Sequence, residues 1–200
     1  MGSGKQFLVA TLAALVVAGG AKSAVAAAEY KIDPAQSTVI FKVKNRDISH
    51  VYGRFNSVSG LIKVNELRNP SEFDFTVEIR SKSLDTNDKK RDKKLKGPDF
   101  FNASAYPKIT FVGKTGKKLK DKKFELTGKL DILGAKKDLT VIFQLTGVKR
   151  IKRGEYRLGG ESTFTVKRSD LGMSFMLPEI ADEVTIMVNI EAFVKLRPAG

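Results

Sequence analysis

The sequence predicts an all-β fold, an antiparallel eight-stranded barrel with a short helix across one end. Eight separate runs of residues alternate between apolar and polar side chains, which is the period of strands and not of helices. Clusters of glycine, lysine and aspartate separate the runs, as turns between antiparallel neighbours do. Because each run has one apolar face, a single domain is expected to hide these faces by closing the sheet into a barrel or folding it into a sandwich.

The runs follow one another along the chain without an internal repeat, a long linker or a second domain. Closure into a barrel also removes exposed sheet edges. Glycines inside the runs, at Gly60, Gly128 and Gly160, suit the bends of a strongly curved sheet. In chain order the runs are residues 39–43, 58–64, 73–79, 109–111, 124–132, 139–145, 158–166 and 184–192.

Residues 86–95 break the alternation and predict the helix. Thr86 is suited to cap its start, and Asp88 falls in its first turn, where the helix dipole favours an acid. Lysines gather towards its end, and Gly97-Pro98 stops it. The helix leads into two adjacent aromatic residues, which we expect to plug or rim the barrel.

Residues 1–28 have the pattern of a secretory signal peptide. A short start that carries Lys5 is followed by an apolar run at 7–17, and small residues at 24–28 fit a cleavage site. The apolar run, of about 11 residues, is shorter than the ~20 that span a bilayer, and an uncleaved anchor is the alternative. We expect an exported, periplasmic protein whose barrel domain occupies residues 29–200.

The composition narrows the possible chemistry. The chain has no cysteine and a single histidine, His50, which excludes thiol catalysis and makes a metal site or a histidine triad unexpected. No glycine-rich phosphate loop and no Gly-x-Ser-x-Gly elbow occur. We therefore expect a binding protein without a metal or cofactor. A catalytic barrel that acts on lipids, with His50 or a carboxylate at its mouth, is the rival class.

The formal net charge of +14 is carried mostly by lysines in predicted turns. A lysine-rich solvated exterior explains this pattern, and attraction to an anionic membrane surface or an acidic partner is the other interpretation. Nucleic-acid-binding proteins more often interleave arginine with exposed aromatic residues along one face, so no nucleic-acid partner is expected.

The predicted interior is apolar and aromatic. An eight-stranded barrel is just wide enough to be filled by side chains or to hold one slender ligand. An elongated apolar ligand fits this lining, and a solid core without a cavity fits the same periodicity. The residues expected to line the barrel are Phe41, Val43, Phe55, Phe75, Val77, Phe111, Leu126, Leu130, Val141, Phe143 and Phe164.

A second group of residues is expected at the mouth of the barrel. The segment 172–178 is apolar yet irregular, and its methionines suit a pliable lid. Arg91 is suited to meet a phosphate or a quinone carbonyl, and an Arg–Asp brace between helix and rim is the structural alternative. The mouth residues are Arg91, Asp92, Phe100, Phe101, Phe175 and Met176.

Short motifs follow one another in order along residues 29–196. They are Tyr30-Lys31-Ile32-Asp33, Val51-Tyr52-Gly53-Arg54-Phe55, Ser83-Leu84-Asp85-Thr86-Asn87, Asp99-Phe100-Phe101-Asn102, Tyr106-Pro107-Lys108-Ile109-Thr110-Phe111, Leu126-Thr127-Gly128, Arg168-Ser169-Asp170-Leu171-Gly172 and Asp182-Glu183-Val184. With these motifs the chain resembles the YceI-like family of exported, lipocalin-like, polyisoprenoid-binding proteins. The first of them looks like the family's first strand.

The resemblance implies a long hydrophobic pore and a periplasmic location without catalysis. It also implies an amphipathic lipid ligand, such as a polyprenyl phosphate, an isoprenoid quinone or a fatty acyl chain, held for transport, storage or sequestration. Many members have a histidine followed two residues later by glycine before the Gly-x-Phe segment, where this chain has Asn45 and Asp47. A stress-linked scaffold or partner-binding barrel without a lipid is the alternative function.

Overall fold

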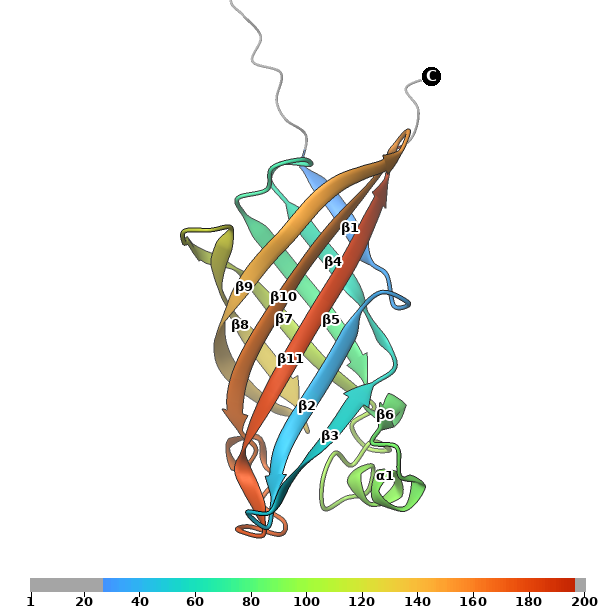
Figure 1. The fold of residues 1–200 in the computed structure, drawn as a ribbon, viewed down its shortest axis with the longest axis vertical. Coiled ribbons are helices and arrows are strands. Elements are labelled where there is room, and N and C mark those ends of the chain that lie inside the picture. The colour runs from blue at the N-terminus through green and yellow to red at the C-terminus, as the bar shows by residue number, and fades with distance from the viewer. Residues whose placement is uncertain (1–26, 197–200) are drawn as a thin grey trace, which may run out of the picture.

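A computed structural model describes residues 27–196 of the 200-residue chain. They form one antiparallel sheet closed into a barrel, with the short helix α1 (Lys89–Leu95) at one end (Figure 1). The predicted fold class is confirmed. Nearly all of the predicted signal peptide lies outside the described residues, as do the last four residues of the predicted domain.

The short strand β1 closes the barrel, because it pairs with β4 on one side and with β11 on the other. Two 3-10 turns, η1 (Ser81–Ser83) and η2 (Ser169–Leu171), interrupt the strand order. The strands are β1 (Ala28–Ile32), β2 (Thr38–Asn45), β3 (Ser49–Phe55), β4 (Val58–Val64), β5 (Phe73–Arg80), β6 (Leu84–Asp85), β7 (Lys108–Lys118), β8 (Lys123–Ile132), β9 (Ala135–Lys152), β10 (Glu155–Lys167) and β11 (Ile180–Lys195).

Two of the eight positions around the barrel are each shared by two successive strands. β1 and β2 lie one after the other along β11, since Lys31 pairs with Phe193 and Val39 pairs with Val188. β3 and β4 share the next position, β3 against β2 and β4 against β1. The eight predicted runs correspond to β2, β4, β5 and β7–β11, so alternation alone missed β1, β3 and the two-residue β6.

Alternation missed β3 because one of its inward positions is a glycine. The ring of Phe41 lies over Gly53 and takes the space that a side chain there would occupy. The ring of Phe143 covers Gly160 in the same way. An aromatic ring over a glycine lies along the inner wall of the barrel, and such pairs help to fix strand register.

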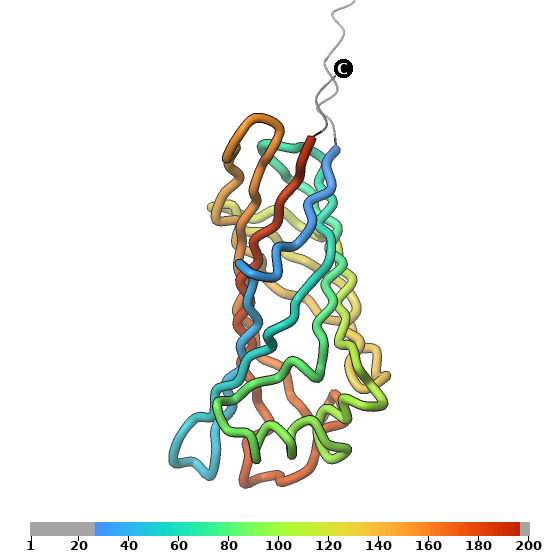
Figure 2. Tube along the Cα trace, turned by 90° about the vertical axis from the view of Figure 1, so that its right-hand side faces the viewer, coloured from blue at the N-terminus to red at the C-terminus, as the bar shows by residue number. Residues whose placement is uncertain are grey.

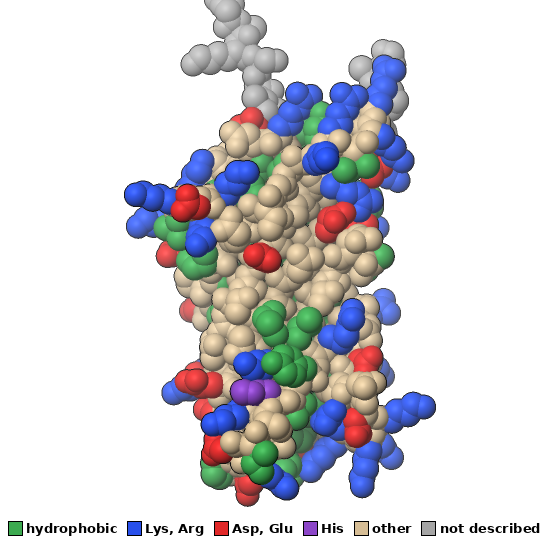
Figure 3. All heavy atoms as spheres, viewed as in Figure 1, with side chains coloured by type: hydrophobic (Ala, Val, Ile, Leu, Met, Phe, Trp, Pro, Cys, Tyr) green, Lys and Arg blue, Asp and Glu red, His purple; other side chains and the backbone are tan. Residues whose placement is uncertain are grey.

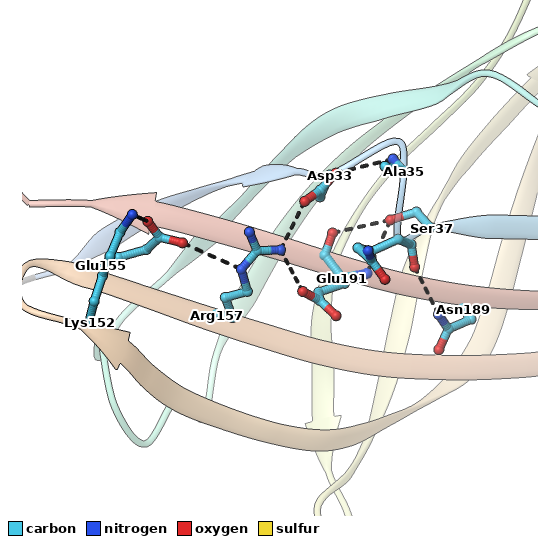
Figure 4. Close-up of polar contacts among 9 residues, drawn as sticks. Asp33, Ala35, Ser37, Lys152, Glu155, Arg157, Asn189 and Glu191 are labelled. Atoms are coloured by element: carbon cyan, nitrogen blue, oxygen red, sulfur yellow. Dashed lines mark hydrogen bonds and ion pairs between the residues drawn. The ribbon is translucent and has the colours of Figure 1, made fainter.

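A cluster of polar contacts holds the turn between β1 and β2 (Figure 4). One carboxylate oxygen of Asp33 accepts a hydrogen bond from the backbone N–H of Ala35 at 3.1 Å, and the other accepts from Arg157 Nη1 at 2.8 Å. The same Nη1 donates to Glu191 at 2.6 Å, and Ser37 Oγ donates to the Glu191 carbonyl at 3.1 Å. The hydrogen bond to Glu191, and next in size the one to Asp33, raise the pKa of Arg157 above its usual value. The cluster ties the turn to β10 and β11.

One end of the barrel interior is filled with aromatic side chains. Tyr30, Phe73 and Phe124 are each at most 1% exposed, and the rings of Phe73 and Phe124 meet edge to face with centroids 4.8 Å apart. The Tyr30 hydroxyl donates to the Leu67 carbonyl at 2.6 Å. Burial, and secondarily the nearby Tyr156, raises the pKa of Tyr30 to about 12. We call this end, at the top of Figure 1, the closed end.

Helix α1 begins after Asp88, so the prediction that Thr86 caps it was wrong. The Asp88 carboxylate accepts a hydrogen bond from the Arg91 backbone N–H at 2.8 Å, and this bond lowers the pKa of Asp88. A carboxylate two residues nearer the first turn reaches its free amides better than the threonine. The segment that contains α1 crosses the end of the barrel opposite the closed end (Figure 2). Within residues 27–196 no helix is long and apolar enough to cross a membrane.

Gly128→Ala is expected to destabilise the fold. A Cβ at Gly128 would lie only 2.5 Å from the Gly113 Cα on the paired strand β7, where backbone cannot move aside without disturbing the sheet. The free energy of unfolding should fall by about 1–3 kcal/mol in urea denaturation. Gly147→Ala is the matched control, because nothing lies within 4 Å of a Cβ there. Equal losses in the two variants would contradict this account.

Candidate functional site

Beyond the closed end the barrel is hollow. A cavity of about 540 Å³ lies inside it and reaches the surface beside α1. This volume lies within the roughly 300–1,000 Å³ of ligand pockets. Its wall begins at Phe75 and Phe143, whose rings meet edge to face at 5.0 Å, and Phe75 stacks on Phe73 of the closed end at 5.8 Å. The described structure is therefore a barrel filled at one end and hollow at the other.

All eleven residues predicted to line the barrel, from Phe41 to Phe164, border this cavity. The strand register explains why they share the inner face. Val77 on β5 pairs with Phe111 on β7, and Phe111 pairs with Leu130 on β8, so their side chains leave the sheet on the same side. That these side chains contact a ligand stays a prediction.

The cavity wall includes residues that the sequence analysis did not select. β11 contributes five wall residues, and the alternation at 184–192 already marked four of them as apolar. Ser162 is a polar member of the wall, and its hydroxyl donates to the Ile142 carbonyl at 2.8 Å. The wall residues from β11 are Ile180, Val184, Ile186, Val188 and Ile190.

The predicted mouth residues fall into two groups. Phe175 lies on the outside, 42% exposed, with its ring edge-on to Phe100 at 5.6 Å. Asp92 does not border the cavity. Its carboxylate instead accepts hydrogen bonds from the backbone N–H of Thr86 at 2.8 Å and from the Thr86 hydroxyl at 2.6 Å. The residues that do border the opening are Arg91, Phe100, Phe101 and Met176.

Arg91 is positioned by Thr86. Its Nε donates to the Thr86 hydroxyl oxygen at 2.8 Å and its Nη2 to the Thr86 carbonyl at 2.7 Å. Since that hydroxyl donates to Asp92, the predicted Arg–Asp brace runs through the threonine. The remaining Nη1 makes no hydrogen bond within residues 27–196. Two more cations of α1, Lys90 and Lys94, border the same opening.

Arg168 is a residue of the cavity wall that the sequence analysis did not select for the site. It borders the cavity, is 5% exposed, and its guanidinium donates four hydrogen bonds to backbone carbonyls at 2.7–3.0 Å. Burial lowers the pKa of Arg168. The four bonds tie down the segment between β10 and β11, which includes the predicted pliable lid. The carbonyls belong to Met173, Phe175, Ile180 and Ala181.

The cavity is equipped to hold an apolar molecule. The carboxylate in its wall is Asp88 at the opening, and this group caps α1. His50 is exposed on β3 and does not border the cavity. Among the described residues, no group of three or more histidine, cysteine, aspartate or glutamate residues is placed to hold a metal ion.

Comparison with known protein families gives one clear match. The sequence model of the YceI-like domain matches residues 30–192. The chain belongs to the YceI-like family. A UPF0312 protein of Pseudomonas aeruginosa strain PAO1 is 35% identical over 185 residues, which cover 90% of this YceI-like chain and 96% of that protein. A UPF0312 protein of Yersinia enterocolitica is 33% identical over 189 residues, 94% of this chain and 96% of the relative.

Solved structures share the YceI-like barrel. BcnA of Burkholderia cenocepacia superimposes with a TM-score of 0.68 at 26% identity, covering 80% of this chain and 99% of that one. The YCEI protein of Campylobacter jejuni gives 0.67 at 31% identity, covering 77% and 91%. A polyisoprenoid binding domain of Saccharophagus degradans gives 0.64 at 16% identity, covering 82% and 98%, and so shares the fold.

Arg168→Met is expected to loosen the segment between β10 and β11. The variant leaves four backbone carbonyls without their guanidinium donor. Amide hydrogen exchange in residues 172–180 should accelerate on the order of tenfold or more. Arg150→Met, at an exposed arginine near the closed end, is the control. Unchanged exchange in Arg168→Met would show that other contacts hold the segment.

Proposed function

We propose that this protein is an exported, non-catalytic binding protein that holds one amphipathic lipid. The isoprenoid or acyl tail lies in the cavity and the head group stays at the opening. One observation carries the proposal: an apolar cavity of about 540 Å³ ends at packed aromatic rings and opens beside the cations of α1. A molecule with an apolar chain and one polar end matches this arrangement.

Burial of the tail supplies the driving force. Each buried CH₂ group contributes roughly 0.8 kcal/mol, so about ten carbons contribute about 8 kcal/mol before the cost of ordering the chain. The phenylalanine rings that lie over glycines keep the interior open for such a chain. The tail enters from the α1 side, because the other end of the barrel is filled.

The cations at the opening favour an anionic or strongly polar head group. Lys90, Arg91 and Lys94 border the opening, and Arg91 is already positioned through Thr86. Its Nη1, which has no hydrogen-bond partner within residues 27–196, is suited to donate to a phosphate oxygen or a quinone carbonyl.

Membership of the YceI-like family supports the proposal in outline. One neighbour is described as a polyisoprenoid binding domain, but at 16% identity that likeness concerns the fold, so the ligand class proposed here rests on the cavity. The pattern of residues 1–28 supports export to the periplasm. Transport, storage and sequestration would all use the same cavity.

Val77→Trp tests the proposal by filling the cavity. Val77 borders the cavity, whereas Val112 lies on the outside of β7 and is 56% exposed. We expect the wild-type protein to bind a polyprenyl phosphate, an isoprenoid quinone or a fatty acid in titrations. Val77→Trp should weaken this binding at least about tenfold, and the matched variant Val112→Trp should not. Thermal unfolding checks that both variants are folded. Failure of all three lipids to bind the wild type would refute the proposal, as would equal binding by Val77→Trp.

Arg91→Ala tests the place of the head group. If Arg91 meets a phosphate, the variant should lose at least about tenfold in affinity for a polyprenyl phosphate, because a charge-assisted hydrogen bond disappears. The loss for an isoprenoid quinone should be smaller, and Arg91→Lys should retain part of the phosphate affinity. Equal losses for the two lipids would remove Arg91 from head-group recognition.

A further inference from the structure

Large apolar side chains are exposed on the loops around the mouth. Ile48, in the turn between β2 and β3, is 86% exposed, and Phe175 and Leu177, between β10 and β11, are 42% and 37% exposed. Single exposed apolar residues are ordinary on protein surfaces. Three such residues around the opening of one apolar cavity indicate an interaction surface.

The two loops that carry these side chains are joined to each other. The Arg46 backbone N–H donates to the Glu179 carbonyl at 2.6 Å, and Asn45 pairs with Ile180. The turn that carries Ile48 therefore lies beside the segment that carries Leu177. Both loops lie at the end opposite the closed end (Figure 1).

The segment between β10 and β11 also contacts α1. Lys94 Nζ lies 4.9 Å from the centre of the Phe175 ring and 3.5 Å from Met176 Sδ, and Phe100 packs edge-on against Phe175. Exposed lysines of α1 thus lie next to the exposed apolar residues. We call Ile48, Phe175, Leu177, Lys90 and Lys94 together the rim surface.

We propose that the rim surface docks onto an anionic phospholipid bilayer, with the mouth of the barrel facing the membrane. The apolar side chains enter the boundary between head groups and acyl chains, and the lysines contact lipid phosphates. Of the acidic side chains near the rim, Asp47 is paired with Lys44 at 2.7 Å, Asp88 caps α1, and Asp182 accepts from Ser169 at 2.7 Å. Asp170 and Glu179 are exposed and make no ion pair within residues 27–196, so the apolar side chains and the α1 lysines must outweigh these two charges.

In this orientation the cavity opens directly onto the membrane, with no layer of water between them. The inference deepens the proposed function and rests on it for its purpose. A lipid tail that leaves the bilayer through the docked mouth enters the cavity without crossing water. Its head group stays at the membrane surface throughout, where Arg91 and the α1 lysines border the opening.

Charge alone points to another orientation. Lysine and arginine gather at the closed end, as the top of Figure 3 shows, and the turns β7–β8 and β9–β10 supply them. A barrel docked by that end would hold its mouth away from the lipid. Ile151, near the end of β9 between Arg150 and Lys152, is 54% exposed and gives a matched apolar position there.

The experiment compares the two ends in one assay. Sedimentation with vesicles of phosphatidylcholine, with and without phosphatidylglycerol, measures docking of the mature protein. We expect binding to the anionic vesicles and a loss of at least about tenfold in the double variant Ile48→Ser/Leu177→Ser. Ile151→Ser should bind like the wild type. Absence of vesicle binding by the wild type, or loss in Ile151→Ser with none in the rim variant, would overturn the proposal.

Lipid binding in solution separates this inference from the proposed function. Neither Ile48 nor Leu177 borders the cavity, so the rim variant should still bind a polyprenyl phosphate in the absence of vesicles. Solution binding kept with docking lost in the rim variant is the expected result. A wild-type protein that binds the lipid in solution but no vesicles refutes docking alone. One that docks through the rim but binds no lipid refutes the proposed function instead.

Discussion

The barrel depends on the five-residue strand β1, which pairs with β4 on one side and β11 on the other. Without this pairing the sheet would have two open edges and its apolar inner face would meet water. The chain must then leave β1 and turn so that β2 can continue along β11. The Arg157 cluster holds that turn, because one guanidinium joins Asp33 of the turn to Glu191 of β11. An ion cluster on the outer face therefore stabilises the geometry of the apolar interior.

Closure alone does not decide whether the interior is solid or hollow, because an eight-stranded barrel accommodates either. Here the placement of aromatic residues decides it. At the closed end Tyr30, Phe73 and Phe124 point into the barrel and fill it. Further along, Phe41 and Phe143 lie over glycines and leave the centre free. Aromatic side chains thus fill one part of the barrel and line the other.

The alternating pattern was enough to predict the fold class and the inner face, since a period of two assigns each residue to one side of the sheet. It missed β3, where Gly53 occupies an inward position without a side chain. The helix cap was assigned to Thr86 from residue type, and residue type could not separate Thr86 from Asp88 because both cap helices. Alternation could not predict that Arg168 holds the segment between β10 and β11. Its four carbonyl partners are set by the path of a loop, and no sequence period describes that path.

The central claim is that the hollow part of the barrel holds one lipid tail. Native mass spectrometry of the protein, purified from the periplasm where we propose that it acts, tests this most directly when organic extraction of the bound material follows. The account predicts one isoprenoid or acyl-chain lipid for each protein molecule. A mass without any adduct, unchanged after incubation with isoprenoid quinones, polyprenyl phosphates and fatty acids, would contradict it.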